Sequence, residues 1–385
     1  MEQNKNEGKM KILEMLASGA ITTEEAMKLL QQFGEEEGEG IDPRQVNPNR
    51  HSDDWQEQAM GPISSSFKSI GDTIEGVVQD IMELDIDLDL ADVFYGGRHK
   101  NVITYVSDPI SQNIAALRLL GKNAGVEIVG YDGRQLRITC SYKAKRPDVQ
   151  VMINEERGAY EVLYDYNAIR SMKIYCEVPR VFVEDIHAES KNASVKMWGV
   201  NGKNINLLTK NGSIKMEHVE AAQIAAKTRN ESVQAQRVKA SELYFETTNA
   251  KITAEHVAAD SAHFITSNAK IATENIDIAQ LYLKTSNASI KMEDIFRTGH
   301  GAGSERSIEA HTTNGGISIY VPRHVAAKLQ ATTTHSRVDC NLQNLLFGEM
   351  SRNYINAKSF DYESAADKAK INLSTTNSSI KIKEA

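Results

Sequence analysis

The chain has 385 residues, of which 41% are hydrophobic and 25% are charged, so it is long enough for two or more domains and apolar enough to bury a core. The net charge of −8 is uneven, because residues 1–62 hold 13 acidic against 6 basic side chains while the remainder holds 39 against 38. This distribution argues against a basic nucleic-acid-binding domain, and no nucleic acid is expected among the partners.

The three cysteines and the N-terminus bear on the cellular compartment. Cys140, Cys176 and Cys340 stand far apart without a CxxC spacing, which fits a reducing compartment or a fold without disulfides. The N-terminus lacks the apolar run of a signal peptide, and no run reaches the roughly 18 apolar residues of a membrane span. We therefore expect a cytoplasmic protein, with a membrane-peripheral or cell-surface location by a non-classical route as the alternative.

Residues 1–33 predict a small helical hairpin. Gly19 separates two apolar helical patterns, and Thr22 with Glu25 three residues later forms a capping box for the second helix. The apolar residues that follow helical spacing are Ile12, Leu13, Leu16, Ala26, Leu29, Leu30 and Phe33.

Residues 34–62 are rich in Gly, Pro, Asn and acid and predict a flexible acidic linker. Residues 63–83 predict an amphipathic helix, with apolar residues at Phe67, Ile70, Ile74, Val77, Val78 and Ile81. Its other face carries acids, whereas helices that lie on membranes usually carry Lys and Arg. We therefore expect this helix to cap the open end of a repeat array.

Residues 84–385 contain a repeat of 19 residues. Six asparagines are separated by this step without exception, and later matches occur at Asn314 and Asn377. The expected ladder is Asn192, Asn211, Asn230, Asn249, Asn268, Asn287, Asn314 and Asn377. Apolar columns keep the same step, and within each unit the apolar residues lie two apart, which is the period of strands. The sequence therefore predicts a mainly β protein, a parallel β-solenoid of 19-residue coils.

The motif Thr-x-Asn has a structural interpretation. Strand alternation points the Thr inward, as at Thr247, while the Asn lies at the turn of the coil. Asn tolerates a left-handed turn backbone, and its amide can bond the coils above and below. We therefore interpret the column as a structural ladder.

The regular coils are predicted over 190–305. Asn314 follows Asn287 by 27 residues, so the eight residues 299–306 are predicted as an insertion from one coil. This glycine-containing loop lacks the strand, GK[ST] and helix of a phosphate loop. Irregular coils are expected over 307–385, where His335, Asn356 and Asn377 continue at 21-residue steps.

Two parts of the chain resemble a known family. The segment KILEMLASGAITTEEAMKLL (11–30) is similar to the short N-terminal helical module of bacterial envelope-stress proteins of the LiaX and YvlB type. The units TTNGGISIYVP (312–322) and TTNSSIKI (375–382) resemble their C-terminal adhesin-like β-strand repeats. The resemblance implies a role in the Gram-positive envelope stress response, including sensing or resisting cationic antimicrobial peptides, with envelope-stress membrane proteins as partners. It offers no catalytic residues.

Candidate binding residues lie beside the ladder. They are one residue before, or two or four residues after, a ladder Asn and form a discontinuous basic stripe: Lys191, Lys196, Lys210, Lys215, Arg229, Lys251, Lys270 and Lys291. Such a stripe suits anionic lipid or wall polymers. The alternative is that edge lysines only discourage aggregation between strands. The acidic N-terminal module is expected either to attract cationic peptides or to be a passive appendage.

We predict a non-enzymatic binding or scaffold protein without cofactor, metal or catalytic residues. An adhesin-like surface protein and a β-helix enzyme acting on polysaccharide are the alternatives. An enzyme needs acids or metal ligands that converge on one face. We interpret the coil acids, for example Glu217, Glu220 and Asp260, as falling at differing offsets on a solvated surface. His256 and His263 lie seven residues apart without metal-ligand spacing, and we expect both on the solvated surface. A third class, ice binding, would need outward-facing Thr, whereas strand alternation points these Thr side chains inward.

Overall fold

The structure is a computed structural model that describes residues 99–296 and 305–385, without the side chains of residues 99 and 100. The expected hairpin (1–33), linker (34–62) and capping helix (63–83) lie outside these residues. The described part is built of strands, and it contains no helix able to span a membrane.

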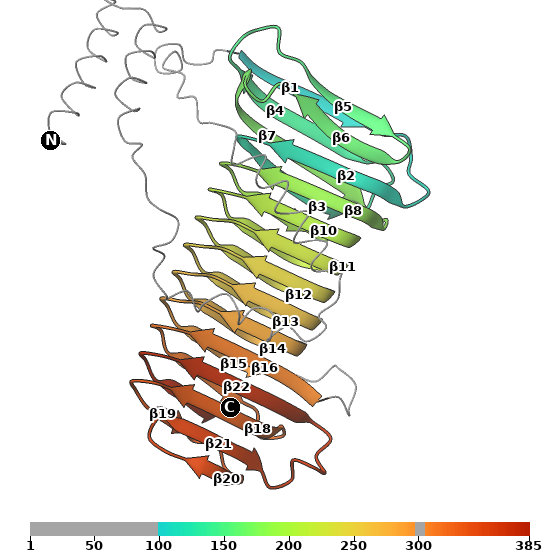
Figure 1. Cartoon of the computed structure of the whole chain (residues 1–385). Coiled ribbons are helices and arrows are strands. Elements are labelled where there is room, and N and C mark those ends of the chain that lie inside the picture. Colours follow the sequence, from blue (N-terminus) through green and yellow to red (C-terminus); the bar gives the residue numbers. More distant parts are fainter. Residues whose placement is uncertain (1–98, 297–304) are drawn as a thin grey trace, which may run out of the picture. The chain divides into compact units, whose positions relative to one another are not determined.

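Strands stack side by side along one axis and form a β-solenoid (Figure 1). Each of the most regular coils contains one 14-residue strand, and this strand pairs in parallel with the strand of the next coil. These strands are β11 (Ile214–Lys227), β12 (Val233–Glu246), β13 (Ile252–Ile265) and β14 (Ile271–Lys284), followed by the shorter β15 (Ile290–Ile295). Partners lie 19 residues apart, for example Val233 with Ile252, which confirms the predicted coil length.

The core consists of the predicted apolar columns. Val233, Ile252 and Ile271 occupy equivalent places in successive coils and are fully buried. Phe245 and Phe264 also stack in the interior, with ring centroids 4.8 Å apart and planes 6° from parallel. Every inward side chain contacts the equivalent side chain of the next coil, so similar apolar residues pack on one another along the axis.

A corner of each coil uses left-handed backbone. Six residues at the 19-residue step have a positive φ: Gly199, His218, Arg237, His256, Asn275 and Asp294. At this column the chain turns outward between two inward positions. The pairing of β11 with β12 is interrupted at the same place, because His218 and Arg237 are not register partners. The expectation that the ladder asparagines adopt this conformation is wrong, because none of them has a positive φ.

At the N-terminal end the strands are out of sequence order. The first coil, β2 with β3, lies between β8 with β9 on one side and β6 with β7 on the other. β4 then adds antiparallel to β7, and β1 adds antiparallel to β4. The strands of this end are β1 (His99–Val106), β2 (Ile114–Gly121), β3 (Ala124–Tyr131), β4 (Arg137–Ala144), β5 (Val151–Glu156), β6 (Ala159–Tyr164), β7 (Ile169–Pro179), β8 (Val183–Ser190), β9 (Val195–Trp198) and β10 (Asn201–Thr209).

The C-terminal end repeats this arrangement. The last coil of the chain, β22 with β23, inserts between β16 with β17 and β18 with β19. The antiparallel strands β21 and β20 then extend the sheet beyond β18. The strands of this end are β16 (Glu305–Thr312), β17 (Ile317–Val321), β18 (Ala326–Thr333), β19 (Val338–Cys340), β20 (Leu345–Met350), β21 (Tyr354–Ser359), β22 (Lys368–Thr375) and β23 (Ile380–Glu384).

Two expectations for this end need correction. The coils of His335, Asn356 and Asn377 do not follow one another in space. The Asn377 coil comes directly after that of Asn314, and Asn356 lies in the antiparallel β21. The insertion predicted over 299–306 also extends too far, because Glu305 and Arg306 already belong to β16. Arg306 is buried, its guanidinium 3.6 Å from Asp277 and 5.0 Å from the ring centre of Phe296.

The left-handed corner gives the first prediction. His256 is exposed with φ of 53°, a conformation that costs a non-glycine residue roughly 1 to 2 kcal/mol. His256→Gly removes this cost and loses part of the gain to the flexibility of the unfolded chain. We expect the free energy of unfolding in urea to rise by about 0.5 to 1 kcal/mol. Gln280→Gly, at an exposed strand position, is the control and should lower it by a similar amount.

Candidate functional site

The Thr of the Thr-x-Asn motif closes the turn of the preceding coil from inside. Thr247 is 1% exposed, and its hydroxyl donates a hydrogen bond of 3.0 Å to the carbonyl of Glu231. Glu231 is the residue after the ladder Asn230, one coil earlier. The same bond recurs at Thr209, Thr228, Thr266, Thr285, Thr312, Thr333 and Thr375. Water cannot reach these turn carbonyls from the core, so the Thr hydroxyls satisfy them.

The asparagines form one continuous amide ladder along the outside of the turns. Each side-chain NH₂ donates to the amide oxygen of the neighbouring coil at 2.6 to 2.8 Å, from Asn192 on Asn123 to Asn377 on Asn314. The imidazole of His335 lies 3.0 Å from Asn377 and ends the row. All eight expected ladder residues lie in this row, together with Asn123, and every amide is exposed or half-buried at the turn.

The basic residues beside the ladder form pairs in adjacent coils. Lys196 lies directly opposite Lys215 in the register of β9 and β11. The backbone N–H of Arg229 bonds to the carbonyl of Lys210, so these two side chains are also neighbours. Lys251 and Lys270 are a third such pair, because they directly precede the register partners Ile252 and Ile271 of successive coils. Among the described residues these six cations have no ion pair with a carboxylate.

The other two residues of the expected stripe behave differently. Lys191 is 3% exposed, so it does not present its ammonium to an outside surface. Lys291 is paired with Glu293 at 2.7 Å, and this contact raises the pKa of the lysine. The stripe is thus a set of three cation pairs that ends before Lys291.

Acidic side chains lie next to the basic pairs. Contrary to the expectation of differing offsets, four of them occupy one column, six residues after a ladder Asn: Glu217, Glu255, Glu274 and Glu293. Between Glu217 and Glu255, the residue in this column is the uncharged Gln236. This carboxylate column borders the basic pairs and limits their field on one side. Within the described ranges no group of three His, Cys, Asp or Glu side chains is arranged to hold a metal ion.

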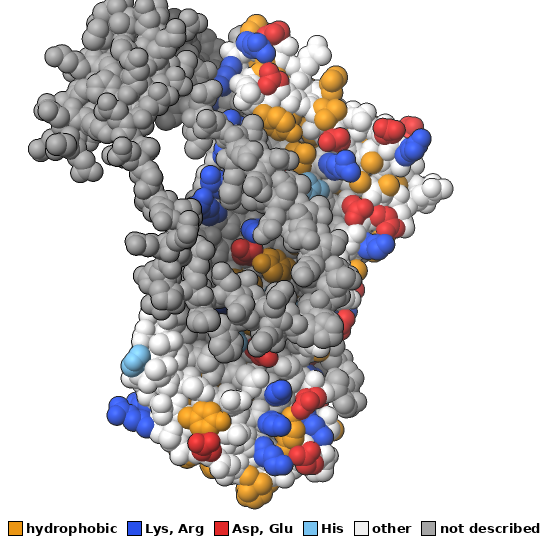
Figure 2. All heavy atoms as spheres, in the orientation of Figure 1, with side chains coloured by type: hydrophobic (Ala, Val, Ile, Leu, Met, Phe, Trp, Pro, Cys, Tyr) orange, Lys and Arg blue, Asp and Glu red, His pale blue; other side chains and the backbone are white. Residues whose placement is uncertain are grey.

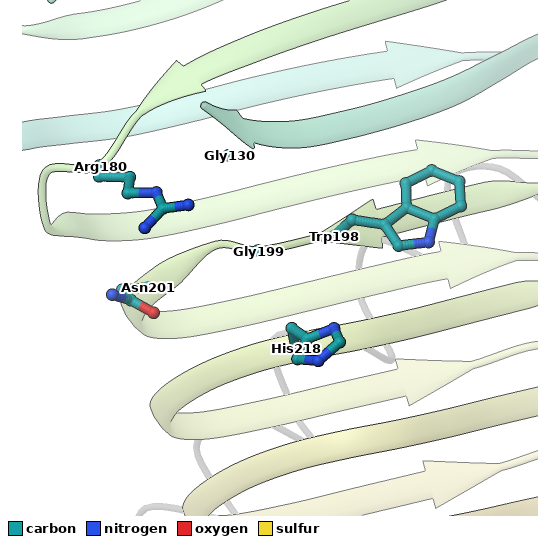
Figure 3. A pocket seen from close by; sticks show the side chains of 6 residues that line it. All are labelled: Gly130, Arg180, Trp198, Gly199, Asn201 and His218. Carbon is teal, nitrogen blue, oxygen red and sulfur yellow. The ribbon is translucent and has the colours of Figure 1, made fainter. Parts of the chain in front are cut away.

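A shallow cavity of about 460 Å³ lies where the N-terminal strands meet the regular coils (Figure 3). Its lining residues are Gly130, Arg180, Trp198, Gly199, Asn201 and His218. A Cβ on Gly130 would lie 1.8 Å from the carbonyl oxygen of Gly199, so two glycines bring the coils together here. The Arg180 guanidinium is held by Asp132 at 2.9 Å.

Sequence analysis missed this cavity, although a signal existed. Trp198 lies in register with Glu217, so an aromatic ring replaces the polar residue of that column. An indole, a guanidinium and an amide line this cavity, and such groups bind polar ligands by stacking and hydrogen bonds. His218 is 3.7 Å from Glu217 at the edge of the cavity, and none of the described lining residues is a Ser, Thr or Cys that could act as a nucleophile.

Burial governs the titratable groups of the core and of the outer sheet. It raises the pKa of the Cys140 thiol to about 12 and that of Cys176 further, so both thiols stay neutral and unreactive at pH 7. Burial lowers the pKa of His263 and His311, whose rings lie 5.5 and 5.7 Å from Tyr282. The expectation of a solvated surface therefore fits the exposed His256 better than the half-buried His263.

Two family models match parts of the chain. The Toastrack DUF4097 family matches residues 116–383, which is more than half of the chain. A SHOCT-like domain matches residues 7–38, overlapping the predicted helical hairpin. No curated protein matches the chain significantly.

Among solved structures, three similar chains have low sequence identity. A "putative cell adhesion protein" of Clostridium sporogenes is 9% identical, with a TM-score of 0.21, and the match covers 74% of this chain and all of that one. A "putative lipid binding protein" of Parabacteroides distasonis is 12% identical, with a TM-score of 0.32 and coverage of 73% and 96%. A "putative adhesin" of Bacteroides fragilis is 10% identical, with a TM-score of 0.29 and coverage of 73% and 97%.

The inward Thr column gives a prediction with an internal control. Thr247→Val leaves the Glu231 carbonyl without its donor and should lower the free energy of unfolding by about 1 to 2 kcal/mol. Thr273 is equally buried, but its hydroxyl has no hydrogen-bond partner among the described residues, so Thr273→Val should raise the free energy of unfolding by about 1 kcal/mol. Urea unfolding of both variants checks this. Equal losses in the two would show that the Thr column acts through shape alone.

Proposed function

The chain belongs to the Toastrack DUF4097 family, and from this premise we propose that it is a non-enzymatic binding and scaffold protein of the bacterial cell-envelope stress response. Its solenoid binds an anionic membrane surface through the ladder edge, by which we mean the three cation pairs beside the asparagine row: Lys196 with Lys215, Lys210 with Arg229, and Lys251 with Lys270. The envelope role is supported by the resemblance of residues 11–30 and of the repeat units to envelope-stress proteins. A membrane-peripheral location follows from this proposal.

The observation that carries the proposal is the set of three cation pairs along the edge. Like charges in adjacent coils repel one another, which costs stability unless an external anion compensates. A solenoid could place neutral residues there, as it does with Thr248, Ser267 and Ser286 in the same column as Arg229. Near an anionic bilayer each Lys or Arg contributes roughly 1 kcal/mol to binding.

The acidic N-terminal region gives this proposal a second part. Residues 1–62 carry 13 acidic against 6 basic side chains, the opposite sign to the ladder edge. Cationic antimicrobial peptides would be attracted to this region while the edge faces the membrane. The proposed division of roles is therefore peptide sensing by the N-terminal region and membrane contact by the solenoid, with envelope-stress membrane proteins as further partners.

The test is co-sedimentation of the full-length protein with vesicles of phosphatidylglycerol and phosphatidylcholine at low and high salt. Lys210→Gln with Arg229→Gln should weaken binding roughly 30-fold at low salt, from about 1 kcal/mol for each lost charge. The loss should be smaller at high salt, because screening already weakens the contacts.

A matched control removes the same charge elsewhere. Lys203 and Lys239 lie within 4.0 Å of Glu184 and Glu220, eleven and nine positions after a ladder Asn. Lys203→Gln with Lys239→Gln should leave vesicle binding unchanged. Equal effects of the two double variants would contradict a role of the ladder edge, and binding to wall polymer but not to vesicles would contradict the membrane as its target.

A further inference from the structure

The C-terminal end of the solenoid exposes large apolar side chains. Leu346 is 43% exposed, Phe347 47%, Met350 64% and Phe360 67%. The first three belong to β20, and Phe360 follows β21 directly. Apolar side chains concentrated on one strand differ from the singly scattered ones that are normal on protein surfaces.

The strand pairing explains why these side chains stay uncovered. Phe347 and Met350 lie opposite the buried Ala357 and Ile355 of β21, so they are on the core-facing side of the sheet. β20 and β21 extend only the sheet of β18, whereas β19 of the opposing sheet pairs with β23 alone in the described structure. The inner face of β20 thus projects past the last coil without an opposing sheet.

A row of lysines runs across the same strands on the outer face. Lys358 of β21 lies directly opposite Lys328 of β18, and Lys328 lies directly opposite Lys370 of β22. Leu346 continues the row on β20, opposite Lys358. All three lysines are exposed, and one carboxylate, Glu363, lies 3.1 Å from Lys358. Nearby lysines lower the pKa of Glu363. Glu349 of β20, opposite Asn356, is a second exposed acid on this face, so three lysines against two acids leave a net positive charge.

In Figure 2, hydrophobic and basic side chains lie next to one another, with some acidic side chains among them, over the end of the molecule where Figure 1 places β20 and β21. Residues 323–385 hold nine basic against six acidic side chains, in a chain whose net charge is −8. Apolar side chains next to lysines are complementary to a lipid bilayer, which has an apolar interior beneath anionic headgroups.

A second copy of the chain fits this end less well. A two-fold dimer through β20 brings each patch against its own copy, so the lysine rows would meet like charges. A bilayer with anionic headgroups offers the opposite charge and an apolar interior at the same place. From these observations we infer that the end formed by β18, β20, β21 and β22 is a membrane-insertion tip, with Leu346, Phe347, Met350 and Phe360 entering an anionic bilayer and Lys328, Lys358 and Lys370 binding lipid phosphates.

This inference rests on the proposed function in that both place the chain at an anionic membrane, but it involves different residues. The direct test uses the full-length protein with Phe347→Trp and vesicles of equal parts phosphatidylglycerol and phosphatidylcholine. Tryptophan emission in excess of the wild-type signal should shift to shorter wavelength and be quenched by brominated acyl chains. Neither effect is expected with phosphatidylcholine alone.

The matched pair of variants replaces exposed apolar residues at the two ends. Phe347→Ser with Met350→Ser should lower partition into the anionic vesicles roughly tenfold, because less apolar surface enters the bilayer. Met152→Ser with Phe182→Ser, at exposed positions of the other end, should leave partition unchanged. Lys328→Gln with Lys370→Gln should lower partition and reduce its dependence on salt. Thermal unfolding verifies that each variant is folded.

The outcomes separate the two proposals. Unchanged partition of the Phe347 and Met350 variant, with loss in the Lys210 and Arg229 variant, would overturn the tip and leave the ladder edge standing. The reverse pattern would support the tip and remove the edge. A wild-type dimer that the Phe347 and Met350 variant converts to monomer would also overturn the tip, because a second copy would then be its occupant.

Discussion

The register between neighbouring coils is the constraint on which the whole solenoid depends. A turn carbonyl of one coil is satisfied by the Thr hydroxyl of the next, and an Asn amide of one coil bonds to the Asn of the next. Both contacts exist only when successive coils are offset by one full repeat. A slip of one residue would turn every inward side chain outward, so the two columns and the apolar core enforce the same register. No single coil can satisfy its own turn.

This dependence makes the two ends the difficult places of the fold. An end coil leaves a sheet edge and a core surface that a further parallel coil would cover. In the described structure both ends use antiparallel strands, β1 and β4 at one and β20 and β21 at the other. At both ends a coil from elsewhere in the chain also inserts between two others, so the end coils are held by neighbours distant in sequence. The antiparallel strands at the C-terminal end leave apolar residues of β20 exposed, and in our proposal these residues enter the membrane.

The outward positions are free of these constraints and carry the chemistry. Side chains between the inward columns vary from coil to coil without breaking the ladder, so basic pairs, a carboxylate column and a Trp-lined cavity occupy one scaffold. The charged surfaces depend on the repeat as well, because stacking at a fixed step brings residues 19 positions apart into contact. Binding by many weak contacts along an array suits an extended anionic surface better than a small substrate.

The sequence by itself determined the strand period, the 19-residue coil, the inward Thr and the row of asparagines, because each depends on contacts between equal positions of consecutive repeats. It also located most of the basic edge, yet it could not show that Lys191 is buried or that Lys291 is paired with Glu293. Only the tertiary structure decided the order of the end coils, the antiparallel ends, the left-handed corner and the cavity at Trp198. The order of the end coils and the cavity arise from pairings between segments far apart in the chain, such as Asn314 with Asn377, and the local periodicity carries no information about them. The left-handed corner does recur at the 19-residue step, but Gly, His, Arg, Asn and Asp share its column, so no single residue type marks it in the sequence.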